Sequence, residues 1–500
     1  MKHNIFLIIT FLLCNICIAQ PKTEMRAVWI ATVANIDFPS SKNLTTEQQK
    51  SELLYILDQF KFNNINTVIL QIRPTADAFY PSALEPWSAW LTGSQGTQPL
   101  PYYDPLQFAI EQAHQRCMEL HVWINPYRAS HKLDNKKFAD THLFLTKPEL
   151  FVKYDGEYYF DPGLDETRLF LNKVVEDIVM RYDIDAIHFD DYFYPYKVAG
   201  KEFPDQKSFE NFPRGFSRNQ KDDWRRNNVN LIISELNRTI KSIKPWVEFG
   251  ISPFGVWRNK KNDVRGSETN ALQNYDDLYA DVLLWLKNGW IDYVTPQLYW
   301  EIGRKNADYA TLARWWSKNC YDANLYIGMS VYRLGNASQG KAWNEGNEIV
   351  RQMEFNSRLP EIKGTMFYNT NSFLRNLKGL NDNLRNKRFR FPALCPSNKN
   401  IVSCASAEPK NLRVIRDGKN AYLAWNAVND EGGCQVSYYV VYAFKGKRAG
   451  KCDKAEHILT LAADNSINLR DFSHLLDGNM TFVVTAFNKF NYESEPSAEL

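Results

Sequence analysis

The strongest constraint on the fold of this chain is a regular alternation of short apolar segments with longer amphipathic ones. The short segments are rich in β-branched and aromatic residues, as strands are, and the longer ones carry apolar residues at helical spacing. The predicted strands cover residues 25–33, 66–73, 121–127, 185–190, 247–253, 291–300, 325–331 and 363–368. The predicted helices cover residues 45–60, 104–120, 165–181, 221–243, 275–287, 309–319, 344–355 and 373–386.

Strands that alternate with helices pair in parallel through right-handed crossovers. Eight such units close into a (β/α)8 barrel, the TIM barrel. A doubly wound open sheet is the alternative, but no Gly-rich nucleotide loop follows the first strand. The sequence therefore predicts an α/β protein whose barrel spans residues 20–394.

The pattern changes after this segment. Residues 395–408 read as a linker, and residues 409–500 contain short alternating strands separated by turn residues, which predicts a small all-β sandwich. The strand with Trp425, the strand with Tyr439 and Tyr442, and the end of the chain resemble a fibronectin type III domain. We expect a spacer or docking role for it.

Residues 1–19 have the pattern of a signal peptide, with a short basic region, an apolar core over 5–13 and a cleavage site after Ala19. The core is too short for a permanent membrane helix, and no later stretch predicts an integral membrane segment in the mature chain. A lipoprotein anchor at Cys14 or Cys17 is disfavoured because no small residue precedes either one. The expected location is outside the cytoplasm, in the periplasm or cell envelope.

Export permits disulfides. The six cysteines of the mature chain contain no C-x-x-C pair, which argues against a zinc or redox motif. The expected pairs are Cys395 with Cys404 and Cys434 with Cys452. Cys117 and Cys320 lie in helical patterns and are expected to be buried free thiols.

The charge balance argues against nucleic acid as a partner. The formal net charge is only +3, and no long run of Lys or Arg occurs. Aromatic residues make up 14% of the chain, with 14 Trp and 26 Tyr. This content fits a large core and also fits the stacking of sugar rings on Trp and Tyr, and both interpretations stay open.

The strand 185–190 ends in two adjacent acids, Asp190 and Asp191. They are followed at once by aromatic residues: Tyr192, Phe193, Tyr194 and Tyr196. Burying acids beside apolar rings is costly unless they are paired, protonated or used. In a parallel barrel the carboxyl ends of all strands converge on one mouth, where active sites lie. Asp190 and Asp191 are therefore the leading catalytic candidates, with an ordinary hydrogen-bond acceptor and a capping or Arg-paired residue as the alternative.

Other strand ends supply further candidates. Glu301 is the third catalytic candidate. The substrate-binding candidates are Arg73, Asn125, Tyr127, His188, Trp257, Gln297, Tyr299, Trp300 and Tyr368. His188 fits a structural hydrogen bond inside the barrel as well as a role in the site, and Arg73 fits an ion pair with Asp190 as well as a substrate clamp. Trp29, Trp123 and Trp285 are assigned to the core. No metal-binding pattern is found, so no metal or other cofactor is expected.

Six strand-end motifs resemble one family of bacterial envelope proteins, the glycosyl-hydrolase-like family 10. They are MRAVWIATVAN (25–35), LQIRPTADA (70–78), WINPYR (123–128), HFDDYFYP (188–195), GISPFGVWR (250–258) and YVTPQLYW (293–300). The resemblance covers residues 24–390. It implies a barrel glycosidase, some relatives of which act on peptidoglycan glycan strands.

A weaker analogy links the acids to chitinase-like barrels, where one acid orients the 2-acetamido group and the other protonates the leaving group. It implies Asp190 as the orienting residue and Asp191 as the acid/base, with Tyr299 near the acetamido group. The sequence departs from that pattern because Tyr192 stands where chitinases keep a Glu. Glu301 is then a rival acid, with Asp190 as nucleophile.

These observations predict an exported glycoside hydrolase that cleaves β-linked glycans containing N-acetylhexosamine, with peptidoglycan glycan as the leading substrate. The alternatives are an endo-glycosidase acting on another polysaccharide and a non-catalytic glycan-binding envelope protein. The oligomeric state is not indicated by the sequence.

Overall fold

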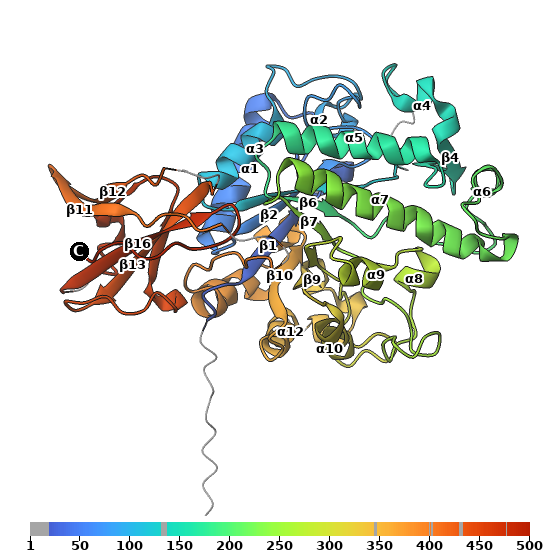
Figure 1. The fold of residues 1–500 in the computed structure, drawn as a ribbon. Coiled ribbons are helices and arrows are strands. Elements are labelled where there is room, and N and C mark those ends of the chain that lie inside the picture. The colour runs from blue at the N-terminus through green and yellow to red at the C-terminus, as the bar shows by residue number, and fades with distance from the viewer. Residues whose placement is uncertain are drawn as a thin grey trace, which may run out of the picture.

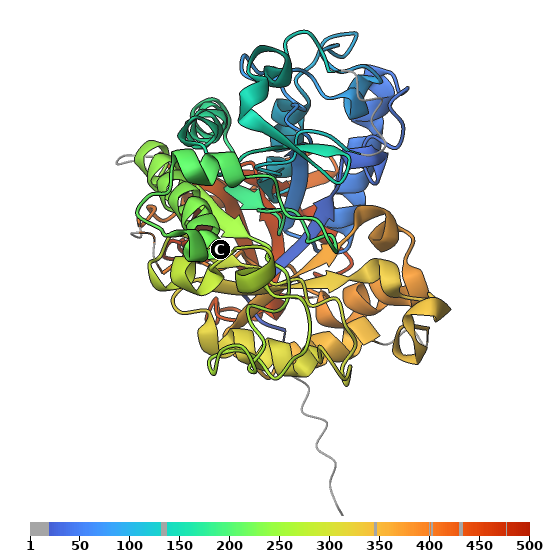
Figure 2. The same ribbon diagram turned by 90° about the vertical axis from the view of Figure 1, so that its right-hand side faces the viewer.

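The computed structural model describes residues 20–131, 138–344, 348–399, 401, 404–429, 434–476 and 478–500, so the predicted signal peptide with Cys14 and Cys17 lies outside the described residues. Eight parallel strands form a closed barrel surrounded by helices (Figures 1 and 2). Their order around the barrel is β1 (Met25–Ile30), β10 (Ile362–Tyr368), β9 (Asn324–Ser330), β8 (Tyr293–Val294), β7 (Glu248–Ile251), β6 (Ala186–Phe189), β3 (Glu119–Ile124) and β2 (Thr67–Arg73). The predicted TIM barrel is confirmed.

The helices that follow these strands are α1 (Thr46–Phe62), α3 (Pro105–His114), α5 (Asp165–Arg181), α7 (Lys221–Ile243), α9 (Val282–Lys287), α10 (Tyr309–Asn319), α12 (Glu348–Asn356) and α13 (Thr370–Leu374). The predicted helix 275–287 is divided into α8 (Asn274–Asp277) and α9, because Tyr279 adopts a left-handed conformation with φ 55°. The predicted helix 373–386 is similarly broken into α13 and α14 (Leu380–Asn383). None of the described helices is long and apolar enough to cross a bilayer.

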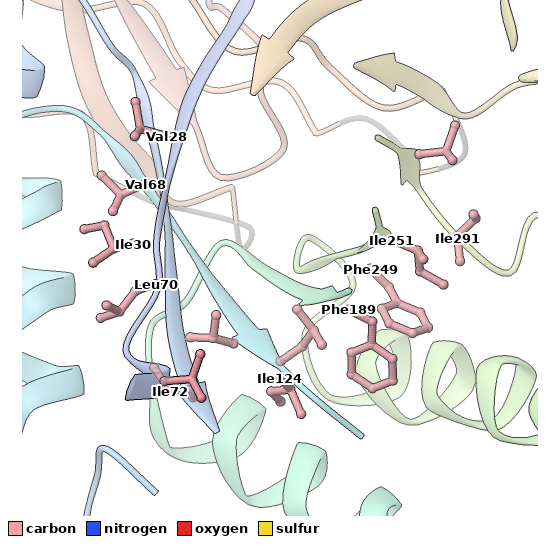
Figure 3. Packing of buried hydrophobic residues seen from close by; sticks show 14 of the residues in the cluster. Val28, Ile30, Val68, Leu70, Ile72, Ile124, Phe189, Phe249, Ile251 and Ile291 are labelled. Atoms are coloured by element: carbon pink, nitrogen blue, oxygen red, sulfur yellow. The ribbon is translucent and has the colours of Figure 1, made fainter. Parts of the chain in front are cut away.

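Side chains of the barrel strands alternate between two apolar clusters. Val28 and Ile30 of β1 and Phe189 of β6 point outward into the layer between strands and helices (Figure 3). Trp29 points inward, where it belongs to the interior cluster that also contains Tyr293. All these residues are almost fully buried, so the barrel is filled rather than open.

Residues after the barrel form two antiparallel sheets of three strands each. One has the order β11 (Lys410–Asp417), β12 (Asn420–Asn426), β15 (Ser466–Asn468), and the other β14 (Ile458–Ala462), β13 (Val436–Lys445), β16 (Met480–Asn488). Trp425 and Tyr439 pack edge to face between them, with ring centroids 5.3 Å apart. The predicted all-β region at the end of the chain is confirmed.

This C-terminal region lies against the end of the barrel where the strands begin, opposite the mouth (Figure 1). Lys489, in the turn after β16, lies 2.8 Å from Asp183 and 3.5 Å from Asp185, both just before β6. Asn491 donates a hydrogen bond of 2.8 Å to Glu119 at the start of β3. The contact therefore covers the amino ends of β3 and β6.

The first part of the predicted linker also belongs to this contact. Asn398 is buried and donates to Glu248 at the start of β7, over 3.3 Å. Leu394, just before the linker, accepts a backbone hydrogen bond from Glu24. Residues 394–398 are therefore held on the barrel rather than extended between two separate bodies.

The disulfide differs from the expected pairs. Cys404 is bonded to Cys434, with Cα atoms 5.6 Å apart, so both predicted pairs are wrong. Cys395 is a buried free thiol beside Thr67 of β2, and Cys452 is also free. The prediction of buried free thiols is confirmed for two residues: Cys117 and Cys320.

Candidate active site

The strand-to-helix connections build the mouth of the barrel. The connection after β2 contains α2 (Ala89–Thr92), the one after β3 contains α4 (Leu143–Thr146) and the hairpin of β4 (Phe151–Tyr154) and β5 (Glu157–Phe160), and the one after β6 contains α6 (Gln206–Asn211). Asp190 and Asp191 follow β6 directly. Both are buried, at 8% and 2% exposure. The leading catalytic candidates thus lie at the end of the barrel where TIM barrels hold their active sites.

Asp190 is held by two donors. Its Oδ1 accepts hydrogen bonds of 2.8 Å from Nε2 of Gln297 and from the backbone amide of Asp191. Burial raises the pKa of Asp190 above its ordinary value, while these hydrogen bonds and the charge of Arg128 oppose that shift. Gln297 is itself fixed because it also donates to the carbonyl of Ser252. It is therefore a positioning residue for Asp190 in this structure.

Asp191 has a different environment. Its Oδ2 accepts a hydrogen bond from the hydroxyl of Tyr196. Burial, and after it the charge of Asp190, raises the pKa of Asp191 well above the ordinary range of a carboxyl group. The two acids cannot both ionise easily in this setting, and Asp191 is the one that keeps its proton. A neutral acid beside an ionised one is the arrangement required for proton donation together with electrostatic or nucleophilic help.

Three tyrosines form one wall near the acids. Tyr299 and Tyr368 stack with centroids 6.2 Å apart, and Tyr332 meets each of them edge to face at 6.1 and 6.0 Å. The charges of Asp190 and Asp191 act on the pKa of both Tyr299 and Tyr368. Tyr332 is 39% exposed, so this wall borders an accessible surface.

A second row of rings lies on the β7 and β8 side. Trp300 packs edge to face on Phe254 at 5.4 Å, and Phe254 packs in the same way on Tyr196, the partner of Asp191, at 6.4 Å. Trp300 is half-buried. Tyr299, Trp300 and Tyr368, all predicted as substrate-binding residues, thus lie in the two groups of rings near the acid pair.

The structure gives Arg73 and Asn125 roles within the protein. Arg73 is fully buried and forms an ion pair with Glu85, with Nη2 and Oε1 2.5 Å apart. Asn125 accepts from Nε1 of Trp123 and donates to the carbonyl of Pro74. Neither the predicted substrate clamp nor the pair with Asp190 is observed for Arg73, because Glu85, from the loop after β2, binds its guanidinium.

Two aromatic candidates are buried among other side chains of the protein. Tyr127 is 2% exposed and belongs to the cluster between strands and helices. Trp257 is 1% exposed and stacks on Trp315 of α10, with centroids 5.8 Å apart and planes at 14°. The expectation that Trp257 stacks on a ligand is contradicted, since a helix far along the chain covers its ring.

His188 is a structural residue of the barrel interior. Its Nδ1 lies 2.9 Å from the hydroxyl of Tyr293, and its Nε2 accepts from Nε1 of Trp29 at 3.2 Å. Burial lowers its pKa well below the usual value, so the ring is neutral. Gly250 makes room for this contact, because a Cβ there would lie 1.9 Å from the Tyr293 ring. Of the two alternatives for His188, the structural hydrogen bond inside the barrel is the one observed.

Glu301 lies beyond Trp300 and is half-buried. Its Oε2 accepts from Nε1 of Trp343, and its Oε1 lies 3.3 Å from Arg304. Burial would raise its pKa, but these hydrogen bonds and the charge of Arg304 lower it below the ordinary value. An ionised carboxylate in these contacts is poorly suited to donate a proton, so Glu301 is a weaker acid candidate than Asp191.

The contacts of two residues near the acids could not be read from the sequence. Tyr196 stands in the sequence only as one of the aromatic residues after the acids, although it is the hydrogen-bond partner of Asp191. In the sequence Arg128 is only the last residue of the motif at 123–128, although its charge acts on both acids. No spacing rule marks either one, because both contacts are made by loops. Within the described ranges, no three His, Cys, Asp or Glu side chains are grouped so that they could hold a metal ion.

Comparisons with known proteins identify the family of this chain. The model of the Glycosyl hydrolase-like 10 family matches residues 24–345. Glycosyl hydrolase YngK of Bacillus subtilis (strain 168) is 44% identical over 436 residues, which are 86% of this chain and 84% of that protein. Glycosyl hydrolase DigH of Escherichia coli (strain K12) is 37% identical over 371 residues, 70% of this chain and 83% of that protein.

Among solved structures, the PgaB (BpsB) glycoside hydrolase domain from Bordetella bronchiseptica aligns with a TM-score of 0.48 and 12% identity, over 73% of this chain and 99% of that one. This distant likeness adds nothing to the argument, which depends on the sequence relatives and the barrel itself. The predicted family and its glycoside hydrolase class are therefore confirmed, and the chain belongs to the glycosyl hydrolase-like 10 family.

Proposed function

We propose that this protein is an exported glycoside hydrolase that cleaves β-linked glycans containing N-acetylhexosamine, with peptidoglycan glycan strands as its substrate. The observation that carries the proposal is the acid pair. Asp190 and Asp191 lie side by side at the mouth, yet Gln297 stabilises the ionised form of one while burial keeps the other protonated. Glycoside cleavage requires these two protonation states at one site.

In the proposed reaction, Asp191 donates its proton to the glycosidic oxygen as the bond to the anomeric carbon breaks. Asp190, as a carboxylate, stabilises the positive charge that develops at that carbon, either directly or by orienting an acetamido group of the sugar that attacks it. Tyr299 is the proposed partner for that acetamido group, since it stands two residues after Gln297, which donates to Asp190. Water then completes the hydrolysis, and Asp191 recovers its proton from that water.

The tyrosine wall supports a carbohydrate substrate. Sugar rings pack their C–H faces on aromatic rings, and Tyr299, Tyr332 and Tyr368 present such surfaces beside the acids. The remaining features of the proposal come from the sequence: the signal peptide at residues 1–19, a periplasmic or cell-envelope location, and a fibronectin type III-like domain at residues 409–500. The order of the strands within its two antiparallel sheets is compatible with a fibronectin type III domain.

The test uses sacculi whose stem peptides have been removed by an amidase. Purified protein is expected to release new reducing ends, and both Asp190→Asn and Asp191→Asn are expected to abolish their release. Release of reducing ends only from another polysaccharide would favour the alternative endo-glycosidase. Binding of glycan without any product would favour the non-catalytic glycan-binding protein.

A further inference from the structure

Arg128 occupies an unusual place in the mouth. It follows β3, and its guanidinium carbon lies 4.4 Å from the centroid of the Tyr192 ring, the residue directly after Asp191. Burial raises the pKa of both Asp190 and Asp191, and the charge of Arg128 opposes that rise, so Arg128 lies within electrostatic reach of the acid pair. A cation therefore contacts the loop that carries the proposed proton donor.

Part of the hydrogen-bonding capacity of this guanidinium is unused. Its Nε is buried and has no hydrogen-bond partner, and no described acid forms an ion pair with Arg128. Two other arginines on the mouth side are neutralised by acids: Arg225 is bonded to Asp205 over 2.8 Å, and Arg258 to Asp276 over 2.8 Å. The nearby Glu157 accepts from the hydroxyl of Tyr159 and raises the pKa of Arg128 only through its charge.

The contact with Tyr192 leaves the donors of Arg128 available. A guanidinium stacked on a ring uses its face, while its N–H groups point outward in the plane and form a fork. That fork matches a carboxylate, which it binds with two parallel charge-assisted hydrogen bonds. A buried donor without a partner costs free energy, so a site that keeps one free is suited to a ligand that supplies the acceptor.

We propose that Arg128 binds a carboxylate carried by the glycan, on a sugar next to the bond that Asp191 protonates. The proposal rests on the proposed glycosidase function and narrows its substrate class. The glycan then contains acidic sugars, either with a lactyl ether as in muramic acid or with a ring carboxylate as in a uronic acid. Neutral polymers of N-acetylglucosamine, which lack this group, are poorer substrates.

The experiment compares matched glycans. Peptide-free peptidoglycan strands with a free lactyl carboxylate are compared with the same strands after reduction of that carboxylate to an alcohol, with neutral chitooligosaccharides and with a uronate-containing oligosaccharide. For the wild type, kcat/KM on the acidic glycan is expected to exceed that on its reduced form by about 10- to 100-fold, the usual contribution of charged hydrogen bonds. The lactyl and uronate arms identify which source of carboxylate is bound.

Arg128→Gln is expected to bring this ratio to about one, mainly through KM, and Arg128→Lys is expected to restore part of it because the charge remains while the fork is lost. Equal rates of the wild type on acidic and reduced glycans would overturn the proposal. It would also be overturned if Arg128→Gln lowered both rates by the same factor, since Arg128 would then act only on the acids. Melting temperatures of both variants verify that they are folded.

A binding measurement separates this proposal from the proposed function. If the wild type cleaves none of these glycans, the hydrolase assignment fails. Calorimetry with a disaccharide of N-acetylglucosamine and N-acetylmuramic acid, and with its carboxyl-reduced form, then decides the role of Arg128. Tighter binding of the acidic form by wild type and not by Arg128→Gln supports the carboxylate site, and equal binding of both forms contradicts it.

Discussion

The two ends of strand β6 carry the same chemical group in opposite environments. Asp185 stands just before the strand, and Asp190 and Asp191 stand just after it. Burial alone would raise the pKa of Asp185, but the charges of His114 and Lys489 lower it below its ordinary value, and Leu120 adds a backbone hydrogen bond of 2.7 Å. At the other end, burial and the charge of Asp190 raise the pKa of Asp191, and the hydrogen bond from Tyr196 and the charge of Arg128 offset this only in part.

The acid before β6 therefore serves the stability of the fold, and the acids after it serve the proposed reaction. The acid at the start is fixed by partners from α3, β3 and the C-terminal region, so it serves as an anchor for the contact between them. The acids at the end are left with unfavourable ionisation, so that one of them still carries the proton that acid catalysis requires. Changes at the two ends should therefore have separable effects, one on stability and the other on rate.

The largest expected effect is that of Asp191→Asn on catalysis. Removing the proton donor should lower kcat on peptide-free peptidoglycan strands by about 10³-fold, within the usual contribution of acid–base groups. Because the raised pKa of Asp191 means that its ionised form opposes folding, the variant should melt at the same or a higher temperature than wild type. Reducing-end release and thermal unfolding measure the two effects. A rate near that of the wild type would remove Asp191 from the mechanism.

The next effect belongs to the other end of the strand. Asp185→Asn leaves Lys489 without its buried acceptor and should lower the free energy of unfolding by about 3 kcal/mol, with kcat at 25 °C unchanged. The pKa of Asp185 is lower in the folded protein than in the unfolded chain. Its ionised carboxylate therefore stabilises the fold fully above the unfolded pKa of about 3.9, and this stabilisation is lost as the pH falls from there toward the lower pKa of the folded state. Denaturant unfolding at pH 7 and in this acidic range tests it. The control is Asp183→Asn. Because the side chain of Asp183 is half exposed, this change should lower the free energy of unfolding by less than about 1 kcal/mol.

The sequence predicted one end of β6 better than the other. Asp190 and Asp191 could be placed at the mouth because they follow a short apolar strand, and the carboxyl ends of parallel strands converge. The partners of Asp185 could not be predicted, because Lys489 comes from the C-terminal region about 300 residues later. Periodicity carries information on local structure and on which end of a barrel a residue reaches, but not on which distant side chain meets it.

The same limit explains the errors at the mouth. Arg73 and Trp257 follow strands just as Asp190 does, yet Glu85 from a loop neutralises the first and Trp315 from a helix covers the second. Tyr279 shows a related limit in the fold, since its left-handed backbone divides a helix that its apolar pattern predicted as continuous. Strand ends thus supply a set of candidates, and packing decides which of them remain accessible.

A smaller effect is expected from Gln297→Ala. Its Nε2 donates to Asp190 and so lowers the pKa of that carboxyl, and removing the donor should raise it. The acidic limb of the pH profile of kcat/KM should then move to higher pH, and kcat/KM at neutral pH should fall by about tenfold, the value of one hydrogen bond to a charged group. Gln107→Ala, on the exposed face of α3, is the matched control. A uniform loss of activity at every pH would indicate that Gln297 binds substrate instead.

The smallest effect tests whether the two ends communicate. A chain of hydrogen bonds runs through the barrel from Glu119 to His121 at 2.9 Å, to Tyr293 at 3.0 Å and to His188 at 2.9 Å. Asn491 contacts its lower end by donating to Glu119. A change at the C-terminal region could in principle be transmitted to the mouth along this chain.

We expect no such transmission, because none of the hydrogen bonds of His188, the upper end, reaches Asp190 or Asp191. The partners of His188 are Trp29, Ser252 and Tyr293. Asn491→Ala should therefore lower the free energy of unfolding by about 1 kcal/mol, the value of one hydrogen bond, and leave the pH profile of kcat/KM unchanged. The pH profile is the decisive measurement. A shift of either limb would show that the neutral imidazole of His188 is coupled to the acids after all, and that the division of β6 into an anchoring end and a catalytic end is incomplete.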